Sequence, residues 1–280
     1  MCRWMAYRGQ PIAIERLLYD TQHSLIEQSR HARMGVETFN GDGFGLGWYG
    51  DAGSPGRYRS LMPAWGDHNL RDLAAHVRSP LFLAHVRATT GTPVQDTNCH
   101  PFRHQNWLFV HNGAIDRFHE IRRELVLAVD PAFYDVIEGS TDSETMFALA
   151  LTFGLNEDPL GGLERMAGFV EEAGRAHGIE HPLQMTLGVS DGERLYAVRY
   201  SSLGQSRTLF TSAEPQTLRA LYPEHELVHT IGDEDRAVVS EPLGDLPGVW
   251  IEVPEATALV IQDGPDEQRT FRPRAFAGAA

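Results

Sequence analysis

The pattern of hydrophobic and polar positions divides the chain into two parts. Before residue 180, short apolar runs over residues 81–87 and 107–112 predict strands, each ending in polar residues. Helices are predicted over residues 70–79, 116–125, 142–153 and 160–177. In the third of these, apolar residues recur at i, i+3, i+4 and i+7 and predict one buried face: Met146, Leu149, Ala150 and Phe153.

From residue 184 onward the pattern changes to strands and tight turns. Residues 184–190 and 194–200 flank an Asp191-Gly192 turn and predict a hairpin. Further strands are predicted over residues 208–212, 237–240, 249–253 and 258–261. Strands in both parts, with helices between them, favour an α+β arrangement in layers over a regular parallel βαβ repeat. We predict one domain that spans residues 2–280.

Composition and charge exclude several classes of protein. The 280 residues include 24 Lys and Arg against 38 Asp and Glu, which gives a net charge of −14. This acidic balance argues against binding to nucleic acid or to an anionic membrane. The chain shows no signal-peptide pattern and no apolar run long enough to span a bilayer, and Cys2 and Cys99 are too few for a disulfide framework. We expect a cytoplasmic protein with reduced thiols.

Two patterns suggest chemistry that their surroundings do not support. Residues 45–50 match the dinucleotide fingerprint G-x-G-x-x-G, but Asp-Ala-Gly-Ser-Pro-Gly follows where a helix must begin. We interpret the glycines over residues 41–50 as tight turns and close backbone packing beside a site. Thirteen histidines, with His100, His104 and His111 near Cys99, show no metal-ligand spacing. We therefore predict no metal and no other cofactor.

Cys2 changes the interpretation of the sequence. Methionine aminopeptidases remove Met1 when the second residue is small, and removal here would leave a thiol and a free α-amine on one residue. An α-amine has a pKa of about 7.7, so it can act as a base near neutral pH. Such a residue combines nucleophile and base, as N-terminal nucleophiles do. A cysteine at position two also arises by chance, so the hypothesis needs support from other segments.

Four segments, in this order, supply that support: Ala84-His-Val-Arg-Ala-Thr-Thr-Gly91, Asn98-Cys-His-Pro-Phe102, His111-Asn-Gly-Ala-Ile115 and Ser140-Thr-Asp-Ser-Glu144. Together with Cys2 they resemble the class II glutamine amidotransferase domains of the N-terminal nucleophile hydrolase superfamily. The start Met-Cys-Arg and residues 60–67 are most similar to two stand-alone branches, single-domain amidotransferases and the ergothioneine-pathway hydrolases of γ-glutamyl amides. The resemblance implies a four-layer αββα fold, in which two antiparallel sheets pack face to face between helices.

The resemblance also implies a catalytic role for three residues. Cys2 would attack the δ-carbonyl of a γ-glutamyl amide and form a thioester, and its α-amine would carry the proton to the leaving amine. Asn112, through its side-chain amide, and Gly113, through its backbone N–H, would form the oxyanion hole.

Four more residues are implied to bind the glutamyl end of the substrate: Arg87, Thr90, His100 and Asp142. Arg87, assisted by Thr90, would bind the α-carboxylate as a fork, and Asp142 would accept the α-ammonium. His100 would lie at the turn that lines the pocket. For the leaving-group side we expect residues 41–48 together with Trp65.

Structural explanations of the same residues stay open. Arg87 could be an ordinary ion-pair partner at a strand end, and Asn112-Gly113 is a common turn pair. Asp142 lies inside Thr141-x-x-Glu144, a capping box in which an acid favours the helix N-terminus by itself. Glucosamine-type family members carry an aromatic residue after the arginine, where this chain has Ala88, so closure of that loop over glutamine is in doubt.

The sequence therefore predicts a cysteine amidohydrolase that acts on glutamine or on a γ-glutamyl compound. A catalytically silent module that binds a glutamate-like ligand is the alternative from another class. An amidotransferase that supplies ammonia to a separate partner protein is a further alternative, because no synthase domain follows in this sequence.

Overall fold

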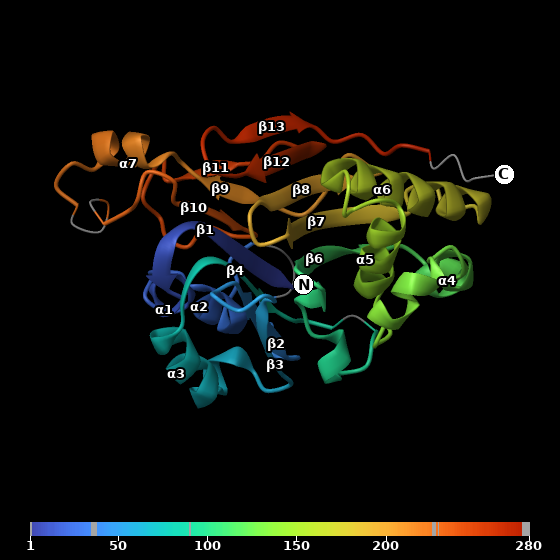
Figure 1. The fold of residues 1–280 in the computed structure, drawn as a ribbon, viewed down its shortest axis with the longest axis horizontal. Helices are drawn as coiled ribbons and strands as arrows, with labels where there is room; N and C mark the ends of the chain where they lie inside the picture. The colour runs from blue at the N-terminus through green and yellow to red at the C-terminus, as the bar shows by residue number, and fades with distance from the viewer. Residues whose placement is uncertain (1, 35–37, 90, 226–227, 229, 276–280) are drawn as a thin grey trace.

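In the computed structural model, which describes residues 2–34, 38–89, 91–225, 228 and 230–275, two antiparallel sheets lie face to face (Figure 1). The seven-stranded sheet has the order β11 (Trp250–Glu252), β9 (Phe210–Ser212), β10 (Arg236–Val239), β1 (Arg3–Ala13), β4 (Arg78–Val86), β2 (Phe44–Trp48) and β3 (Gly56–Ser60). The six-stranded sheet has the order β13 (Glu267–Thr270), β12 (Thr257–Ile261), β8 (Leu195–Ser201), β7 (Leu183–Ser190), β6 (Trp107–Ile115) and β5 (Phe102–His104).

Helices cover the outer face of each sheet. On the seven-stranded sheet these are α1 (Glu15–Leu18), α2 (Leu25–Arg30) and α3 (His68–His76). On the six-stranded sheet they are α4 (Phe118–Leu127), α5 (Asp142–Thr152) and α6 (Pro159–Ala176). A further helix, α7 (Pro215–Leu221), forms its own small apolar cluster at one end of the molecule (Figure 1).

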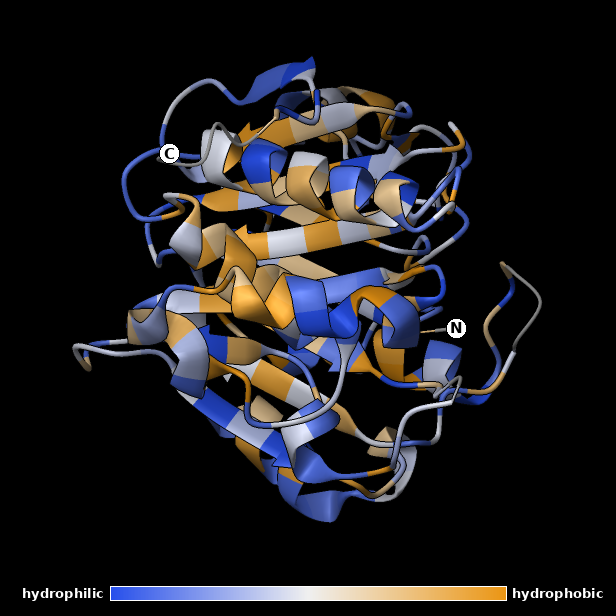
Figure 2. Ribbon diagram, turned by 90° about the vertical axis from the view of Figure 1, so that its right-hand side faces the viewer, coloured by the Kyte–Doolittle hydropathy of each residue, from blue (hydrophilic) through white to orange (hydrophobic). Residues whose placement is uncertain are grey.

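The alternation of side chains along the strands builds these layers. In β1, Met5 and Tyr7 pack with the helices α1 to α3, while Trp4 and Ala6 face the other sheet. Successive strand residues point to opposite faces, so a strand inside a four-layer fold is apolar on both faces. Figure 2 shows the hydrophobic residues of strands and helices gathered toward the interior of this sandwich. The predicted α+β sandwich of four layers is confirmed.

Most predicted elements are present, with two differences. The helix predicted over residues 70–79 is α3 and ends at His76, because Pro80 disfavours a helical residue before it and Ser79 already pairs with Ile12 in the sheet. The expectation of tight turns over residues 41–50 is wrong, because residues 44–48 form strand β2.

The glycines of β2 serve close packing between the sheets. A Cβ atom on Gly45 would lie 2.0 Å from the backbone oxygen of His100, and one on Gly47 would lie 2.8 Å from the Leu108 side chain. The part of the interpretation that concerned close backbone approach is therefore confirmed. These glycines allow residues 99–101 to lie directly against β2.

We predict that Gly45→Ala destabilises the protein by about 1–3 kcal/mol, because the backbone of His100 must move to admit a methyl group. Gly50→Ala is the matched control, since no heavy atom lies within 4 Å of the position of its Cβ. Urea denaturation of both variants measures the difference. Equal free energies of unfolding for the two variants would contradict this account of β2.

Candidate active site

Strand β1 places Cys2 at the end of the seven-stranded sheet. Arg3 pairs with Val86, the last residue of β4, so Cys2 lies beside the segment that follows β4. The half-buried Cys2 thiol donates a hydrogen bond to the Ala88 carbonyl, with the sulfur 3.6 Å from the oxygen. Burial raises the pKa of the Cys2 thiol, although the neighbouring positive charge of Arg87 acts in the opposite direction. The thiol is therefore protonated at neutral pH and needs a base before it can attack.

The Arg87 guanidinium is buried directly after β4 and is bound by neutral acceptors. One terminal nitrogen lies 2.6 Å from the Thr92 hydroxyl, 3.1 Å from the Pro93 carbonyl and 3.3 Å from the Thr89 hydroxyl. The other donates to the Asp42 carbonyl at 3.4 Å. No carboxylate within the described residues pairs with Arg87, so the explanation that it is an ordinary ion-pair partner finds no support there. Thr90, its expected assistant, lies outside the residues that the structure describes.

Asn112 and Gly113 lie inside strand β6, so their interpretation as a turn pair is wrong. They pair with Thr186 and Met185 of β7. In an antiparallel strand, successive N–H groups point to alternate edges, and that of Ile115 donates to Asp142 at 2.8 Å. The Gly113 N–H, two residues earlier, is directed to the same edge of β6. A Cβ on Gly113 would lie 2.0 Å from the Gln184 backbone oxygen, which explains why this position holds glycine.

A short hydrogen-bond chain fixes β6 against the N-terminal strand. Trp4 Nε1 donates to Thr186 Oγ1 at 3.1 Å, and this hydroxyl donates to the Asn112 carbonyl at 3.3 Å. All three residues are buried. Because Trp4 follows Cys2 by two residues, these hydrogen bonds couple the position of Asn112 to that of Cys2 across the two sheets.

Asp142 opens helix α5 and is only half-buried. The capping box predicted for Thr141 and Glu144 is present, with both reciprocal hydrogen bonds. The Asp142 carboxylate itself accepts from the backbone N–H of Ile115 and from Ser143, whose N–H and hydroxyl lie 2.8 Å and 3.2 Å from its Oδ1. A carboxylate has about four acceptor sites, so one stays open to a further donor. Its negative charge also contributes to the raised pKa of the Cys2 thiol, after the larger effect of burial.

His100 is buried among aromatic rings. Its ring packs at a tilt against His85 and Phe102, at 4.1 Å and 4.3 Å between centroids. Within the described residues its two ring nitrogens have no hydrogen-bond partner. Burial lowers the pKa of His100 well below its ordinary value, so the ring is neutral. His100 is only 4% exposed, and its expected role in lining the pocket stays a prediction.

His85 of β4 and His111 of β6 extend this buried histidine group. His85 Nε2 lies 3.2 Å from the His111 carbonyl, and His111 Nδ1 lies 2.8 Å from the Ser143 hydroxyl. Burial lowers the pKa of His85 to about 3. A neutral His85 thus donates to the peptide group that precedes Asn112, and sequence reasoning missed this contact.

The two cysteines differ in environment. Cys99 is fully buried, and burial raises its pKa to about 11. Its sulfur contacts only backbone oxygens, those of Ser60 and Gln95 at 3.8 Å each, among the described residues. Cys2 is the accessible thiol of the pair, because only its side chain is partly exposed.

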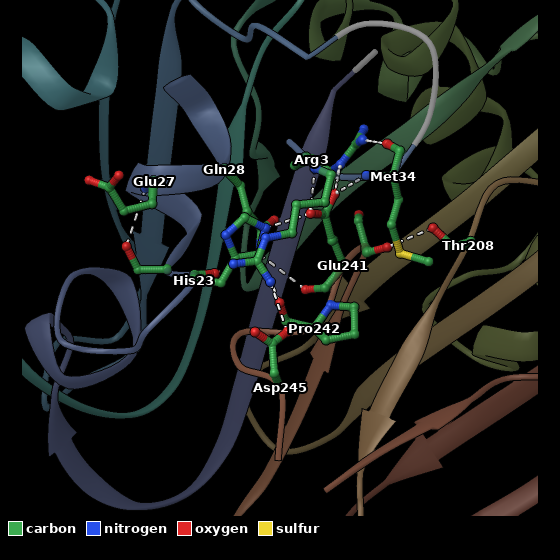
Figure 3. Close-up of polar contacts among 12 residues, drawn as sticks. Arg3, His23, Glu27, Gln28, Met34, Thr208, Glu241, Pro242 and Asp245 are labelled. Atoms are coloured by element: carbon green, nitrogen blue, oxygen red, sulfur yellow. Dashed lines mark hydrogen bonds and ion pairs between the residues drawn. The ribbon is translucent and has the colours of Figure 1, made fainter. Parts of the chain in front are cut away.

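Sequence reasoning also missed a buried polar cluster next to Cys2, formed by Arg3, His23, Gln28 and Glu241 (Figure 3). Arg3 Nε lies 3.1 Å from one oxygen of Glu241, and His23 Nε2 lies 2.6 Å from the other. The only signal in the sequence was the arginine that follows Cys2. Glu241 lies 238 positions further along and carries no local signal.

Neither a metal centre nor a membrane helix is found in the part of the chain that the structure describes. No group of three or more His, Cys, Asp or Glu side chains there is arranged to hold a metal ion. None of its helices is long and apolar enough to cross a membrane.

The fold and the site together define a glutamine amidotransferase domain of the N-terminal nucleophile type. The family model for class II glutamine amidotransferases matches residues 20–276. The chain belongs to this family, and the resemblance read from its motifs is confirmed.

Named relatives fall into both stand-alone branches. The chain is 32% identical to the probable glutamine amidotransferase DUG3 of Saccharomyces cerevisiae, over 94% of this chain and 82% of that protein. It is 30% identical to the γ-glutamyl-hercynylcysteine sulfoxide hydrolase of Mycolicibacterium smegmatis, over 94% and 96%. A solved class II domain protein of Silicibacter pomeroyi superposes with a TM-score of 0.75 at 34% identity, covering 98% of this chain and 100% of that one. The Bacillus subtilis glutamine phosphoribosylpyrophosphate amidotransferase shares the fold at 16% identity, with a TM-score of 0.66, over 98% of this chain and 50% of that one.

The Glu241 carboxylate should make stability depend on pH. Burial alone would raise the pKa of Glu241, but hydrogen bonds from His23, from two backbone N–H groups and from Arg3 hold it below its usual range. A carboxylate with a lowered folded-state pKa stabilises the fold above its ordinary pKa and loses this contribution as pH falls through the folded-state value.

We predict that Glu241→Gln lowers the free energy of unfolding at pH 7 by about 1.5–3 kcal/mol. The difference between wild type and variant should shrink as the pH falls below 4 or so, because both side chains are then neutral. Urea denaturation at a series of pH values measures it. A difference that stays constant down to pH 3 or so would show that the charge of Glu241 contributes nothing.

Proposed function

We propose that the protein is a cysteine amidohydrolase that cleaves the γ-amide of glutamine or of a γ-glutamyl compound through a thioester on Cys2. The observation that carries the proposal is the position of the partly exposed Cys2 thiol, which donates a hydrogen bond to the residue directly after the buried Arg87. Two relatives support it by name, one a glutamine amidotransferase and one a γ-glutamyl amide hydrolase.

Removal of Met1 would complete the nucleophile. The thiol of Cys2 is protonated at neutral pH, so the free α-amine of the same residue would take its proton as the sulfur attacks the δ-carbonyl carbon. The amine would then give this proton to the leaving nitrogen as the carbon–nitrogen bond breaks. Water would hydrolyse the thioester by the same route in reverse, which releases glutamate and restores the thiol.

The open edge of β6 would stabilise the oxyanion. The Gly113 N–H is directed to the edge at which Ile115 meets Asp142, and β5 pairs only with residues 107–109 of β6. With the Asn112 side chain, this N–H would supply two donors to the developing negative charge. Each such donor typically contributes about 2.7–4 kcal/mol in the transition state.

Arg87 and Asp142 would recognise the amino-acid end of the substrate. The hydrogen bonds of Arg87 now go to hydroxyl and carbonyl oxygens, and a substrate carboxylate would replace some of them with stronger, charge-assisted bonds. The open acceptor site of Asp142 would take the α-ammonium. Thr90 would assist Arg87, and His100 would support the wall of the pocket from behind.

The leaving-group side is where an aromatic pair would act. Phe39 and Trp65 meet edge to face at 4.9 Å between centroids, and Phe39 is 58% exposed. Asp42, three residues after Phe39, accepts from the Thr89 N–H beside Arg87, so this pair borders the site. We propose that it contacts the amine that leaves, in a cytoplasmic setting that keeps the thiol reduced.

Replacement of the nucleophile gives the first functional prediction. Cys2→Ala should abolish amide hydrolysis and leave the unfolding temperature within a few degrees, because the lost side chain is partly exposed at a chain end. A glutamine analogue with an electrophilic δ-carbon should label Cys2 and leave the buried Cys99 unmodified. Peptide mapping identifies the modified residue, and Cys99 as the only labelled residue would overturn the assignment.

The oxyanion hole gives the second prediction. Asn112→Ala should lower kcat by about 10²–10³ with little change in KM, because its side chain meets a charge that develops only in the transition state. Steady-state kinetics separate the two parameters. A rise in KM at constant kcat would instead make Asn112 a substrate-binding residue.

Substrate preference gives the third prediction. Acetylation of the α-amine of glutamine removes the charge that Asp142 would accept and should cost about 1.5–3 kcal/mol in kcat/KM. Equal turnover of glutamine and acetylglutamine would contradict the role of Asp142. A panel of γ-glutamyl amides with larger leaving amines tests the Phe39–Trp65 face, and strong preference for a bulky amine favours a hydrolase over a supplier of ammonia to a partner protein.

A further inference from the structure

Beyond the proposed function, on which this inference rests, we propose that Arg3 and Glu241 act as a positioning pair for the nucleophile. The pair would fix the backbone of Cys2 once Met1 is removed. It would thereby hold Cys2 at a fixed position relative to the loop that contains Arg87. Glu241 belongs to none of the motifs that carry the family resemblance, and Arg3 enters them only as the third residue of the start Met-Cys-Arg.

Arg3 holds the Cys2 carbonyl directly. One terminal nitrogen of its guanidinium lies 3.0 Å from the Cys2 oxygen, Nε lies 3.1 Å from Glu241 Oε2, and the remaining nitrogen donates to the Met34 carbonyl. The guanidinium is planar, so three acceptors around its rim fix its orientation. Once Met1 is removed, the Cys2 carbonyl belongs to the same residue as the thiol and the free α-amine. By binding this carbonyl, Arg3 would limit the rotation of Cys2.

Glu241 fixes Arg3 and the residues 33–34 with one carboxylate. Oε1 accepts from the Arg33 N–H at 2.8 Å and lies 2.6 Å from His23 Nε2, and Oε2 accepts from the Met34 N–H at 3.1 Å. Figure 3 shows these groups converging on Glu241 beneath Arg3 and Met34. Four donors match about four acceptor sites of a carboxylate, so Glu241 is saturated and cannot bind a ligand.

The backbone of Glu241 is held as firmly as its side chain. Gln28 of α2 donates to the carbonyls of His23 and Glu241 at 2.9 Å and 3.2 Å. Ser240 donates its N–H to the Trp4 carbonyl at 2.9 Å and accepts from the Trp4 N–H through its hydroxyl at 3.0 Å. The carboxylate is thus a fixed reference point beside β1.

The same cluster reaches the loop at Arg87. The Ala32 N–H donates to the Thr38 carbonyl, and the Asn40 N–H donates to the Ser29 carbonyl. Asp42 then accepts from the Thr89 N–H at 2.8 Å. Glu241 therefore connects Cys2 with the far side of the pocket, where the substrate carboxylate would bind.

A buried ion pair is weak evidence for stability, because the cost of desolvating two charges offsets much of their attraction. Placement of a nucleophile is a stricter demand, since a displacement of about 1 Å can cost roughly 100-fold in rate. We infer a positioning role because the Arg3 guanidinium, held by Glu241, donates to the Cys2 carbonyl and so fixes its place.

The test compares Arg3→Lys and Glu241→Gln with the wild type at a temperature well below unfolding. Arg3→Lys keeps the positive charge but loses the planar guanidinium with its fixed set of donors. Glu241→Gln keeps the shape of the side chain but replaces one acceptor oxygen with an NH₂ donor. Glu164→Gln is the matched control. Glu164 is a buried residue of α6, in the helix layer that covers the other sheet, and its carboxylate lies 2.7 Å from Arg274 Nε. The probes are L-glutamine for kcat and KM, and the electrophilic glutamine analogue for the rate and stoichiometry of Cys2 labelling.

We expect both variants to label fully but roughly 10–100-fold more slowly, with kcat lowered in proportion and KM nearly unchanged. The labelling rate and kcat of the double variant should be no lower than those of the less active single variant, because the two residues act as a unit. Glu164→Gln should lower the free energy of unfolding and leave the labelling rate, kcat and KM unchanged. The stoichiometry at the end of labelling gives the number of folded sites. A fraction of protein that fails to fold therefore lowers the stoichiometry but does not change the labelling rate per folded site.

Two results would overturn the inference. Labelling of Arg3→Lys and Glu241→Gln at the wild-type rate would show that the pair does not position Cys2. A higher KM at unchanged kcat would assign the pair to substrate binding instead. Failure of the wild type to label at Cys2 is a separate result, which contradicts the proposed function and removes the inference with it.

Discussion

The antiparallel pairing of β1 with β4 and β10 is the constraint on which the site depends. This pairing fixes Arg3 opposite Val86 and Met5 opposite Val239, and thereby brings the first residues of the chain to the end of β4. Cys2 can contact Ala88, and Arg3 can reach Glu241, only because the three strands run in this register. A slip of one residue would exchange the two faces of β1 and turn Trp4 toward the helices.

The two sheets share the work of building the site. In the proposed site, the seven-stranded sheet carries Cys2 and Arg87, while the six-stranded sheet carries Asn112 and Gly113 and, through the start of α5, Asp142. The contact between Trp4 and Thr186 crosses from one to the other and ends on Asn112. A face-to-face sandwich suits this arrangement, because β1 and β4 of one sheet lie against β6 of the other.

The sequence could predict the parts of the site that are local. Arg87, Asn112-Gly113 and Asp142 each stand in a short motif, and the capping box around Asp142 was readable from four residues. Glu241 was out of reach, because its partner Arg3 lies 238 positions away and an acid after a strand gives no signal. Strand β1 was also missed, since it is buried on both faces and shows no alternation. The glycines of β2 suggested turns, whereas the backbone of His100 packed against them decides the structure there.

The most direct test of the account is the chemical state of the N-terminal residue during turnover. The protein is mixed with glutamine or a γ-glutamyl amide, stopped in acid within a turnover, and its N-terminal peptide is analysed by mass spectrometry. The account predicts a peptide that begins at Cys2 and carries a γ-glutamyl group on sulfur, which hydroxylamine removes. A peptide that uniformly retains Met1 and carries no acyl group would contradict it.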